Sequence, residues 1–427
     1  MFDTEITERK IVQRAMIVGV QSPEERDTVI SEHLDELAEL LNNLGIETTG
    51  RQVVRLRTVH PQYHVGSGKA EEIAGLFHEW GCDVLVFDTD LSPSQQRNWE
   101  RLVKAAVIDR REVILDIFAE RATTKEAILQ VELARLEYSL PRLTRAWTHL
   151  SRQRGGAKGT RGEGEKQIEA DRRMVQHRIT ALKSELEQIR RQRSTMRKNR
   201  QRSDVAKAAI VGYTNVGKSS LLNALSGSDV LAEDKLFATL DPSTRRVVLP
   251  GNTELIMTDT VGFVRKLPHM LVEAFKSTLE EAAYADFLVV VLDVSSEFLE
   301  EHWETTISVL NELDAADKEM IVVFNKSDLE HDQVLEARAR GLFPRGLFVS
   351  VKSGQGMDQL KSELASMARR HCRTLKVLLP PGRSDLAALA YARGRVYESE
   401  YDEEGNLRLI FSIGTNLEER YNSYILN

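Results

Sequence analysis

The sequence predicts an α/β protein that contains a long, purely helical segment. Strand-like and helix-like stretches alternate over residues 1–120, a helix-only pattern covers about 125–203, and the alternation returns from 205 to about 371. Alternating strands and helices are typical of parallel or mixed sheets covered by helices. After Pro380 and Pro381 the remaining stretches are short and mixed, which favours a small α+β C-terminal domain over 373–427.

Composition is that of a globular chain of about two to four domains. The 427 residues are 41% hydrophobic and 29% charged, with a net charge of −7. This balance argues against a nucleic-acid coat protein but leaves room for a local basic patch. No apolar run reaches the roughly 18 residues of a membrane-spanning helix, and the N-terminus MFDTEITERK lacks an apolar signal core. We therefore expect a cytoplasmic protein without a membrane span.

An N-terminal α/β domain is predicted over residues 1–124. Its expected elements are a strand at Ile11–Val20, a helix at 31–44, a strand at Gln52–Val59, a helix at 69–80 and a buried strand at Val84–Phe87. Ser92 is a candidate N-cap with Pro93 at the first helical position. Val113–Phe118 follows as a further apolar run.

A helical hairpin is predicted over residues 125–204. Two stripes at alternating spacings of three and four residues predict coiled-coil helices. The first stripe is Leu129, Leu133, Leu136, Leu140, Leu143, Trp147 and Leu150, and the second is Val175, Ile179, Leu182, Leu186 and Ile189. Pro141 predicts a kink or break in the first helix.

The predicted tip of this hairpin, residues 154–165 (RGGAKGTRGEGE), is rich in glycine and basic. A second basic run, over 190–202, contains no acidic residue. Such segments could neutralise phosphates of RNA. The alternatives are a disordered linker for the tip and a solvated coiled-coil face for the basic run.

The motif that points most directly to chemistry is G-x-x-x-x-G-K-S, between an apolar strand and a helix. Its glycines let backbone N–H groups surround phosphate at a helix N-terminus. Lys218 is expected to reach the β- and γ-phosphates and Ser219 to offer a hydroxyl to Mg²⁺. The expected nucleotide contacts are Gly212, Tyr213, Thr214, Asn215, Val216, Gly217, Lys218 and Ser219.

Three more motifs follow apolar strands in the order of a guanine-nucleotide fold. DTVG supplies a carboxylate near Mg²⁺ and a glycine N–H near the γ-phosphate, while a buried Asp328 in NKSD would pair with the guanine N1–H and N2–H₂ edge and disfavour adenine. SVK is suited to closing over the base. The expected contacts are Asp259, Thr260, Val261 and Gly262; Asn325, Lys326, Ser327 and Asp328; and Ser350, Val351 and Lys352. Residues 205–372 are thus predicted to form a P-loop GTPase domain with a mostly parallel sheet and helices on both faces.

A switch segment is expected between the P-loop helix and DTVG. FATLDPSTR (237–245) offers the hydroxyls of Thr239 and Thr244, and a threonine there can bind Mg²⁺ only while the γ-phosphate is present. The expected nucleotide contacts in this segment are Phe237, Ala238, Thr239, Leu240 and Asp241.

The sequence predicts the residues that act in hydrolysis less directly than the residues that bind the nucleotide. Phe263 follows DTVG where Ras-like GTPases place a water-orienting Gln, so we expect slow hydrolysis without a partner. Lys218, Thr239 and Gly262 are candidates for stabilising the transition state or positioning water. The side chain of Asn215 could coordinate K⁺ against the phosphates, or could make a plain loop hydrogen bond.

Several segments together resemble HflX-type GTPases, of the Obg–HflX group of translation-associated P-loop GTPases. They are YHVGSGKAEEI (63–73), SPSQQRNWERL (92–102), VILDIFAERA (113–122), RGEGEKQIEADRR (161–173), FATLDPSTR (237–245) and DTVGFVRKLP (259–268). The resemblance favours Thr239, with Ser219, as the Mg²⁺ ligands. SVK in place of SAK and GEGEKQIEADRR in place of GPGETQLETDRR are small departures.

The resemblance implies a factor that binds the large ribosomal subunit, splits or rescues ribosomes or acts in their biogenesis, and hydrolyses GTP to GDP with Mg²⁺. The hairpin tip would contact ribosomal RNA, and we expect a monomer. The first alternative is an ATP-dependent RNA-remodelling enzyme acting through the N-terminal region, where HVGSGKAEE (64–72) lacks P-loop spacing. The second is a non-enzymatic regulatory scaffold.

Overall fold

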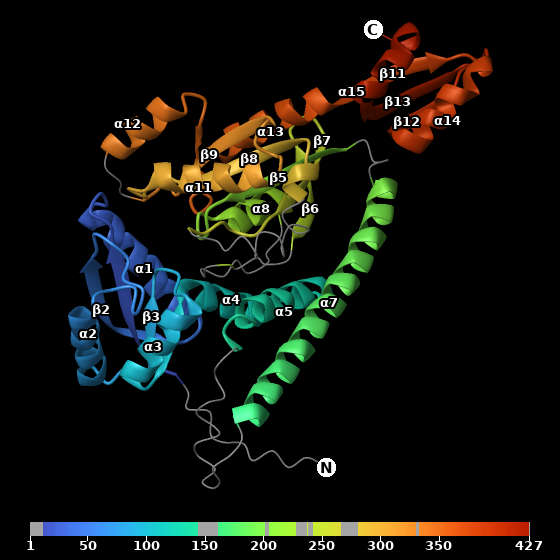
Figure 1. Cartoon of the computed structure of the whole chain (residues 1–427). Helices are drawn as coiled ribbons and strands as arrows, with labels where there is room; N and C mark the ends of the chain where they lie inside the picture. Colours follow the sequence, from blue (N-terminus) through green and yellow to red (C-terminus); the bar gives the residue numbers. More distant parts are fainter. Residues whose placement is uncertain are drawn as a thin grey trace. The chain divides into compact units, whose positions relative to one another are not determined.

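The computed structural model describes residues 12–143, 161–200, 205–227, 237, 242–265, 281–329 and 333–426 (Figure 1). Within α7, only the backbone is described at 161–168, 190 and 192–200. The chain divides into two compact units. The first comprises residues 1–122 and 131–182, and the second 123–130 and 183–427. The described helices include none that is long and apolar enough to cross a membrane.

The first unit contains a four-stranded parallel sheet of order β2-β1-β3-β4. Its strands are β1 (Arg14–Gln21), β2 (Glu47–Arg55), β3 (Val84–Phe87) and β4 (Ala106–Asp109). The helices that alternate with them are α1 (Asp27–Asn43), α2 (Ser67–Glu79), α3 (Pro93–Val103) and α4 (Arg110–Arg121). The α/β interpretation of this region is confirmed.

The predicted N-cap and first residue of α3 are confirmed. Ser92 and Gln95 form a capping box, and Pro93 is the first helical residue. The helix places Trp99, which is fully buried, in the core of the sheet. One expectation needs correction: the second strand is Glu47–Arg55 and so lies earlier than Gln52–Val59. The apolar run Val113–Phe118 forms part of α4, which contacts β4 and α1.

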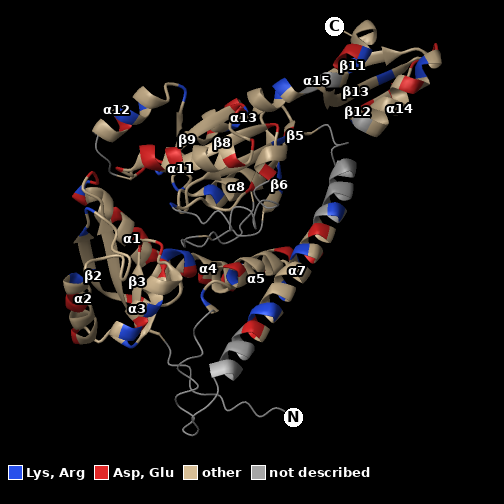
Figure 2. Ribbon diagram, in the orientation of Figure 1, with Lys and Arg blue, Asp and Glu red and all other residues tan. Residues whose placement is uncertain are grey.

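The helical segment consists of α5 (Lys125–Ser139) and α7 (Arg161–Arg200). Because α5 ends before Pro141, the predicted break is confirmed. Arg178 of α7 forms a forked ion pair with Glu132 of α5, with both N···O distances at 2.8 Å. Within the described stretch of α7, Figure 2 shows basic and acidic residues interspersed along the ribbon.

The predicted glycine-rich tip lies mostly outside the described residues. Its last part, 161–165, is the first turn of α7 rather than a loop. Glutamate and lysine neighbours favour helix and can offset two glycines. Residues 144–160, which include the remainder of the tip and the end of the first leucine stripe, are not described.

A buried polar network, here called the clasp, ties the end of α5 to the carboxyl end of β4. The Tyr138 hydroxyl donates to Asp109 Oδ1 at 2.9 Å and to Glu112 Oε2 at 3.2 Å. The Arg142 guanidinium donates to Gln96 Oε1 at 2.7 Å, to the Leu91 carbonyl at 3.0 Å and to Asp109 Oδ2 at 3.3 Å. The turn after α5 is therefore fixed to the sheet of the N-terminal domain.

The second unit contains a six-stranded sheet of order β10-β9-β8-β5-β7-β6, in which only β6 among the described strands is antiparallel. Its strands are β5 (Ala206–Gly212), β6 (Ser243–Leu249), β7 (Thr253–Asp259), β8 (Phe287–Asp293), β9 (Met320–Asn325) and β10 (Leu347–Phe348). Its helices are α8 (Lys218–Ser226), α11 (Leu299–Glu312), α12 (Gln333–Leu342) and α13 (Met357–His371). This is the P-loop GTPase topology that the motifs predict.

A small antiparallel sheet of order β11-β13-β12 ends the chain. Its elements are β11 (Cys372–Leu379), η2 (Pro381–Arg383), α14 (Ser384–Arg393), β12 (Arg395–Tyr401), β13 (Leu407–Gly414), α15 (Thr415–Glu418) and η3 (Glu419–Tyr424). Phe411 and Tyr421 lie in its own core. β11 begins directly after α13, and Arg395 forms an ion pair with Glu254 of β7.

Candidate nucleotide site

The four predicted motifs lie at one edge of the six-stranded sheet. The P-loop begins at Gly212, the last residue of β5; Asp259 ends β7, Asn325 ends β9, and Ser350 follows β10. The strands β5, β7, β9 and β10 run parallel through the pairs β5·β7, β5·β8, β8·β9 and β9·β10, so their carboxyl ends meet at the same edge. The sheet thus brings together residues more than a hundred positions apart.

The P-loop requires glycine at both ends. Gly212 has φ 145°, and a Cβ there would lie 2.2 Å from the Val291 carbonyl oxygen. Gly217 has φ 90°, and its Cβ would lie 2.3 Å from Asn325 Nδ2. Between them Asn215 has a left-handed φ of 60°, which asparagine tolerates better than most residues. The loop therefore winds tightly into α8, whose first N–H groups face the site.

Lys218 lies inside this loop. Its ammonium group donates to the Tyr213 carbonyl at 2.6 Å, and the residue is only 6% exposed. Burial lowers the pKa of Lys218 to about 8, while the carboxylate of Asp259 acts in the opposite direction. The neutral Tyr213 carbonyl thus binds the Lys218 ammonium group within the P-loop. A negatively charged phosphate in this loop would bind the ammonium group more strongly than the carbonyl does.

Ser219 and Asp259 form an oxygen-donor pair suited to Mg²⁺. The Ser219 hydroxyl donates to Asp259 Oδ2 at 2.6 Å, and Asp259 is almost fully buried. Hydroxyl and carboxylate oxygens are the ligands that Mg²⁺ prefers, usually with water and phosphate completing its shell. The pair therefore fits the predicted metal position. The described residues contain no cluster of three or more His, Cys, Asp or Glu side chains that would offer an alternative site.

The segment after Asp259 lies directly on the P-loop. The Thr214 N–H donates to the Phe263 carbonyl at 2.8 Å, and the Phe263 N–H donates to the Gly212 carbonyl at 3.1 Å. A Cβ on Gly262 would lie 2.9 Å from the backbone Cα of Thr214, so only glycine fits there. The Phe263 side chain is 1% exposed. The residue at the water-orienting position is thus part of the core.

Asn325 connects two loops of the site. Its Nδ2 donates to the Val216 carbonyl at 2.8 Å, and its Oδ1 accepts from the Val351 N–H at 3.2 Å. Lys326, with a left-handed φ of 64°, forms an ion pair with Asp293 at 2.7 Å. Asp293 was not identified from the sequence, because it belongs to no motif. The feature that could have identified it is its position at the end of the apolar strand β8, which pairs it with Asn325.

Asp328 is exposed rather than buried, which corrects the expectation for the base-recognising carboxylate. It lies beyond β9 in a loop, and a hydrogen bond with Ser350 is the main cause of its lowered pKa, with Lys352 contributing. Ser350 itself is fully buried, and its hydroxyl accepts from the Ser353 N–H at 3.0 Å. The NKSD and SVK loops therefore support each other.

The switch segment is described only in part. Ala238, Thr239, Leu240 and Asp241 lie outside the described residues, so the predicted Mg²⁺ role of Thr239 stays a prediction. Phe237 is buried with a φ of 55°. Thr244 lies in β6, with its hydroxyl 3.0 Å from that of Thr258 on β7, which makes it part of the strand pairing rather than the switch.

One functional contact was missed by sequence reasoning. The Tyr213 hydroxyl accepts from the Arg265 N–H at 2.8 Å, and its ring stacks on His302 with centroids 4.0 Å apart. Tyr213 is an expected nucleotide contact, but the second residue of a P-loop motif is an unspecified x, so the pattern gave no reason to expect contacts with Arg265 and His302. The contact fixes Arg265 relative to the phosphate-binding loop.

The fold and the site together define a P-loop GTPase. Family models match three consecutive stretches: a GTP-binding GTPase N-terminal region at residues 31–119, a GTP-binding GTPase middle region at 121–200, and a 50S ribosome-binding GTPase at 207–326. The P-loop and DTVG lie within the third stretch, NKSD begins at its end, and SVK follows after it.

Relatives extend the match over nearly the whole chain. GTPase HflX of Akkermansia muciniphila is 52% identical over 94% of this chain and 95% of its own length. GTPase HflX of Escherichia coli K12 is 40% identical over 93% and 92%. The chain belongs to the HflX family of GTPases and is a GTP-binding, GTP-hydrolysing protein. A crystal structure of a GTP-binding protein from Sulfolobus solfataricus in complex with GDP is 23% identical, has a TM-score of 0.43, and covers 84% of this chain and 99% of that one.

Proposed function

We propose that this protein is a cytoplasmic, monomeric factor that binds the large ribosomal subunit in its GTP state and acts in ribosome splitting, rescue or biogenesis. The observation that carries the proposal is the joining of the P-loop, DTVG, NKSD and SVK loops at one sheet edge, because such a site can report which nucleotide is bound. The match of residues 207–326 to a 50S ribosome-binding GTPase model supports the choice of partner.

In this proposal the P-loop N–H groups and Lys218 bind the phosphates, and the NKSD and SVK loops hold the guanine base. Ser219 and Thr239 would hold Mg²⁺ directly, with Asp259 orienting the Ser219 hydroxyl. Bound there, Mg²⁺ would neutralise charge on the β- and γ-phosphates. Gly262 lies close to Lys218 without a side chain to obstruct the phosphate. The chain therefore contributes binding, charge and position rather than covalent chemistry.

Hydrolysis is proposed to be slow without a partner. The Phe263 side chain is buried and cannot hydrogen-bond to water, so another group must position the nucleophile. Single-turnover GTP hydrolysis should accelerate when large ribosomal subunits are added. Equal rates with and without subunits would contradict this proposal.

A K⁺ role is proposed for Asn215, which lies between Gly212 and Gly217 of the P-loop with a left-handed φ of 60°, because its side-chain carbonyl could coordinate a cation against the phosphates. The test compares GTP hydrolysis in K⁺ and in Na⁺ at equal ionic strength, for the native chain and for Asn215→Ala. Faster hydrolysis in K⁺ that disappears in the variant would support the role, and equal rates in both salts would refute it.

The decisive experiment for the ribosomal role is co-sedimentation with ribosomal subunits in sucrose gradients. The protein is tested without nucleotide, with GDP and with a non-hydrolysable GTP analogue. Preferential binding to the large subunit with the analogue is expected. Equal sedimentation in all three states, or none in any, would contradict a GTP-dependent ribosome factor.

The hairpin tip is proposed as the RNA contact. Reversing the charges of Arg152, Arg154, Lys158 and Arg161 should abolish binding to the large subunit while sparing GTP binding. Reversing an equal number of exposed charges elsewhere is the control. Unchanged co-sedimentation of the tip variant would refute the contact.

The N-terminal region is a weaker candidate for an ATP site. In open α/β sheets ligands bind outside the carboxyl ends of the strands. Here Arg142 and Tyr138 of the clasp fill that edge beside β4, and Arg110 pairs with Asp88 beside β3. A truncated chain lacking residues 205–371 that still hydrolysed ATP would favour the RNA-remodelling alternative.

A further inference from the structure

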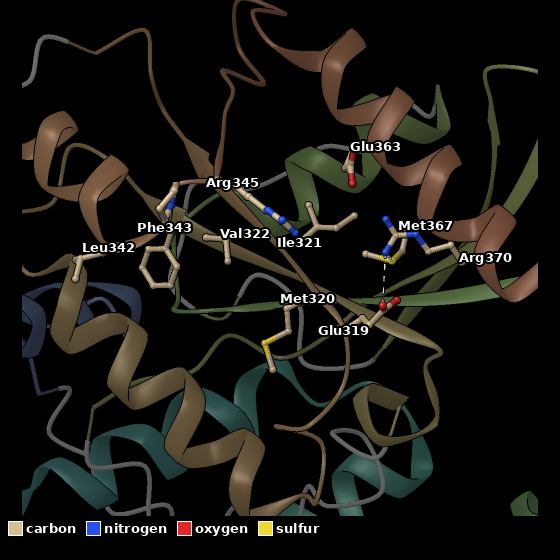
Figure 3. Close-up of a pocket in the computed structure, with 12 residues that line it drawn as sticks. Glu319, Met320, Ile321, Val322, Leu342, Phe343, Arg345, Glu363, Met367 and Arg370 are labelled. Atoms are coloured by element: carbon tan, nitrogen blue, oxygen red, sulfur yellow. Dashed lines mark hydrogen bonds and ion pairs between the residues drawn. The ribbon is translucent and has the colours of Figure 1, made fainter.

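A pocket lies at the end of the GTPase sheet opposite the nucleotide site (Figure 3). It encloses about 500 Å³. It is bounded by the start of β9, the turn after α12 and one side of α13; its lining includes Met320, Val322, Phe343, Arg345 and Met367. Asn325, which serves the nucleotide site, ends the same strand. The pocket is therefore separate from the GTP-binding edge.

One wall of the pocket is the first half of β9, which pairs with β8 on one side but, among the described residues, has no strand on the other side, that of β10. β10 is only two residues long and pairs with Val323 and Phe324, so the first half of β9 extends beyond it. The Val349 N–H donates to the Phe324 carbonyl, and the Leu288 N–H on β8 donates to the Glu319 carbonyl. Because peptide groups alternate in direction along a strand, those of Met320 and Val322 face the β10 side.

The chain itself does not extend β10 to cover this edge. The Gly346 N–H donates to the Phe343 carbonyl at 2.9 Å, which turns the chain away, and Pro344 has no N–H to offer. Gly346 is packed so closely that a Cβ would lie 2.4 Å from Phe324 Cε2. Among the described residues, no backbone hydrogen bond joins the turn at 343–346 to Met320 or to the Val322 N–H. This edge is open to an added strand.

The walls beside this edge are apolar and preformed. Ile321 and Met367 are buried at its base, and Leu342 is 46% exposed at its rim. Phe343 is held by edge contact with Trp303 at 4.6 Å between ring centroids. Methionine adapts to ligands of different shape. The pocket therefore fits an aliphatic or aromatic side chain next to the open edge.

Charge on the pocket favours an acidic ligand group. Figure 3 shows the Arg345 side chain reaching across the pocket toward Ile321. Arg370 lies at the rim, where it shares Glu319 with His371 at 3.5 and 3.6 Å. Glu363 also lines the pocket and would repel a second acid placed beside α13. A single carboxylate near Arg345 is the best match.

We propose that this pocket binds an extended segment of a partner protein, which adds as a short strand beside Met320–Val322. The segment inserts one apolar side chain between Phe343 and Met367 and places an acidic side chain against Arg345. The open backbone groups favour a polypeptide over a small anion, because only a polypeptide can satisfy them in register.

The test begins with a randomised heptapeptide library displayed on phage. It is selected on the full chain loaded with GDP, so that the nucleotide site is occupied. Enriched peptides are synthesised, and their affinities are measured by fluorescence anisotropy. We expect them to share an apolar residue next to Asp or Glu. Failure to enrich any peptide would overturn the proposal.

Variants then locate the binding. Arg345→Glu should weaken the enriched peptides by about tenfold or more, and peptides with Lys in place of the acid should recover affinity for that variant. Arg420→Glu, the same change at an exposed arginine of the C-terminal domain, is the control. Equal affinity of the peptides for native chain and Arg345→Glu would contradict the proposal.

The backbone pairing has its own readout, since Val322→Pro, which removes the outward N–H, could impair folding. Methylating single amides of an enriched peptide should weaken binding at alternate positions only. Equal weakening by methylation at every position of the peptide would contradict strand addition. Displacement of the peptide by inorganic phosphate, at concentrations that leave GDP bound, would indicate simple anion binding. Either result would overturn the proposal.

Discussion

Asn325 and Lys218 each use buried polar atoms to hold a loop that must also meet a ligand. Asn325 donates from Nδ2 to the Val216 carbonyl and accepts at Oδ1 from the Val351 N–H, so it joins loops that follow different strands. Lys218 is held by the Tyr213 carbonyl within the P-loop. Buried polar groups of this kind contribute little net free energy when paired and cost much when orphaned.

Replacing Lys218 with alanine removes the buried ammonium group. Lys218→Ala should lower GTP affinity about 10- to 100-fold, because hydrogen bonds between charged groups are lost while alanine is compatible with the start of α8. Titration with a fluorescent GTP analogue measures the effect, and Lys361→Ala on α13 is the matched control. Native affinity in Lys218→Ala would show that the P-loop lysine does not meet phosphate.

Asn325→Ala tests the connection between loops without touching phosphate. The Val216 carbonyl and the Val351 N–H would lose their partner in a buried setting, so the free energy of unfolding should fall by about 1–3 kcal/mol. Urea denaturation measures it. The control is Asn311→Ala at an exposed position on α11, expected to change stability by less than about 0.5 kcal/mol. Similar losses in both variants would argue against the connecting role.

At the scale of elements, the clasp attaches the end of α5 to the sheet of the N-terminal domain. Arg142 lies just beyond the end of α5, and its guanidinium also stacks over the Tyr138 ring at 3.6 Å. Burial raises the pKa of Glu112 to about 7, and the charges of Asp109 and Asp116 add to the increase. Burial also raises the pKa of Asp109, which Arg142 opposes. Two carboxyl groups thus share one tyrosine hydroxyl and one guanidinium.

This raised pKa predicts a pH dependence with a definite sign. Glu112 ionises near pH 4.5 in the unfolded chain and near 7 in the fold, so the native state keeps a proton that the unfolded state has lost. The free energy of unfolding should therefore fall as pH rises from about 4.5 to about 7, by about 3 kcal/mol at most. Glu112→Gln should flatten this slope, whereas Glu120→Gln at an exposed position of α4 should not. Denaturation curves across pH 4–8 provide the measurement; parallel slopes in both variants would rule out Glu112 as the source.

The contrast between the P-loop and the clasp shows what a sequence can predict. The P-loop needs only a short run of residues, since Gly212, Gly217 and Lys218 act through local backbone geometry, and the motif located them all. The clasp joins Arg142 to Leu91, 51 residues earlier, and Tyr138 to Asp109, 29 residues earlier. No local pattern marks such partners. β4 was also missed: unlike the wholly apolar β3 of the same length, it ends in an aspartate and leads directly into α4.

At the scale of the whole molecule, the second unit contains two sheets with separate cores. The C-terminal sheet packs around Phe411, while Arg395 reaches Glu254 on β7 of the GTPase sheet. Glu254 is 10% exposed at its side chain and also lies 3.6 Å from Arg246. This buried carboxylate couples the two sheets through charge as well as through the chain.

Arg395→Ala should weaken that coupling. The Arg395 side chain is 40% exposed but that of Glu254 only 10%, so removing Arg395 leaves a largely buried carboxylate with only Arg246 beside it. The C-terminal sheet should then unfold at a lower temperature than the GTPase sheet. Calorimetry of the GDP-bound protein should then show two transitions in place of a more cooperative one. Arg408→Ala on the exposed face of β13 is the control, and an unchanged thermogram for Arg395→Ala would show that the chain connection alone joins the domains.

The direct passage from His371 into Cys372 has a mechanical consequence. A tether of loose residues would let the last sheet swivel freely, but here any reorientation must fray the final turn of α13 and break its hydrogen bonds. A pull on the C-terminal sheet would therefore be transmitted as strain into the helix that lies beneath β7, rather than dissipated at a hinge.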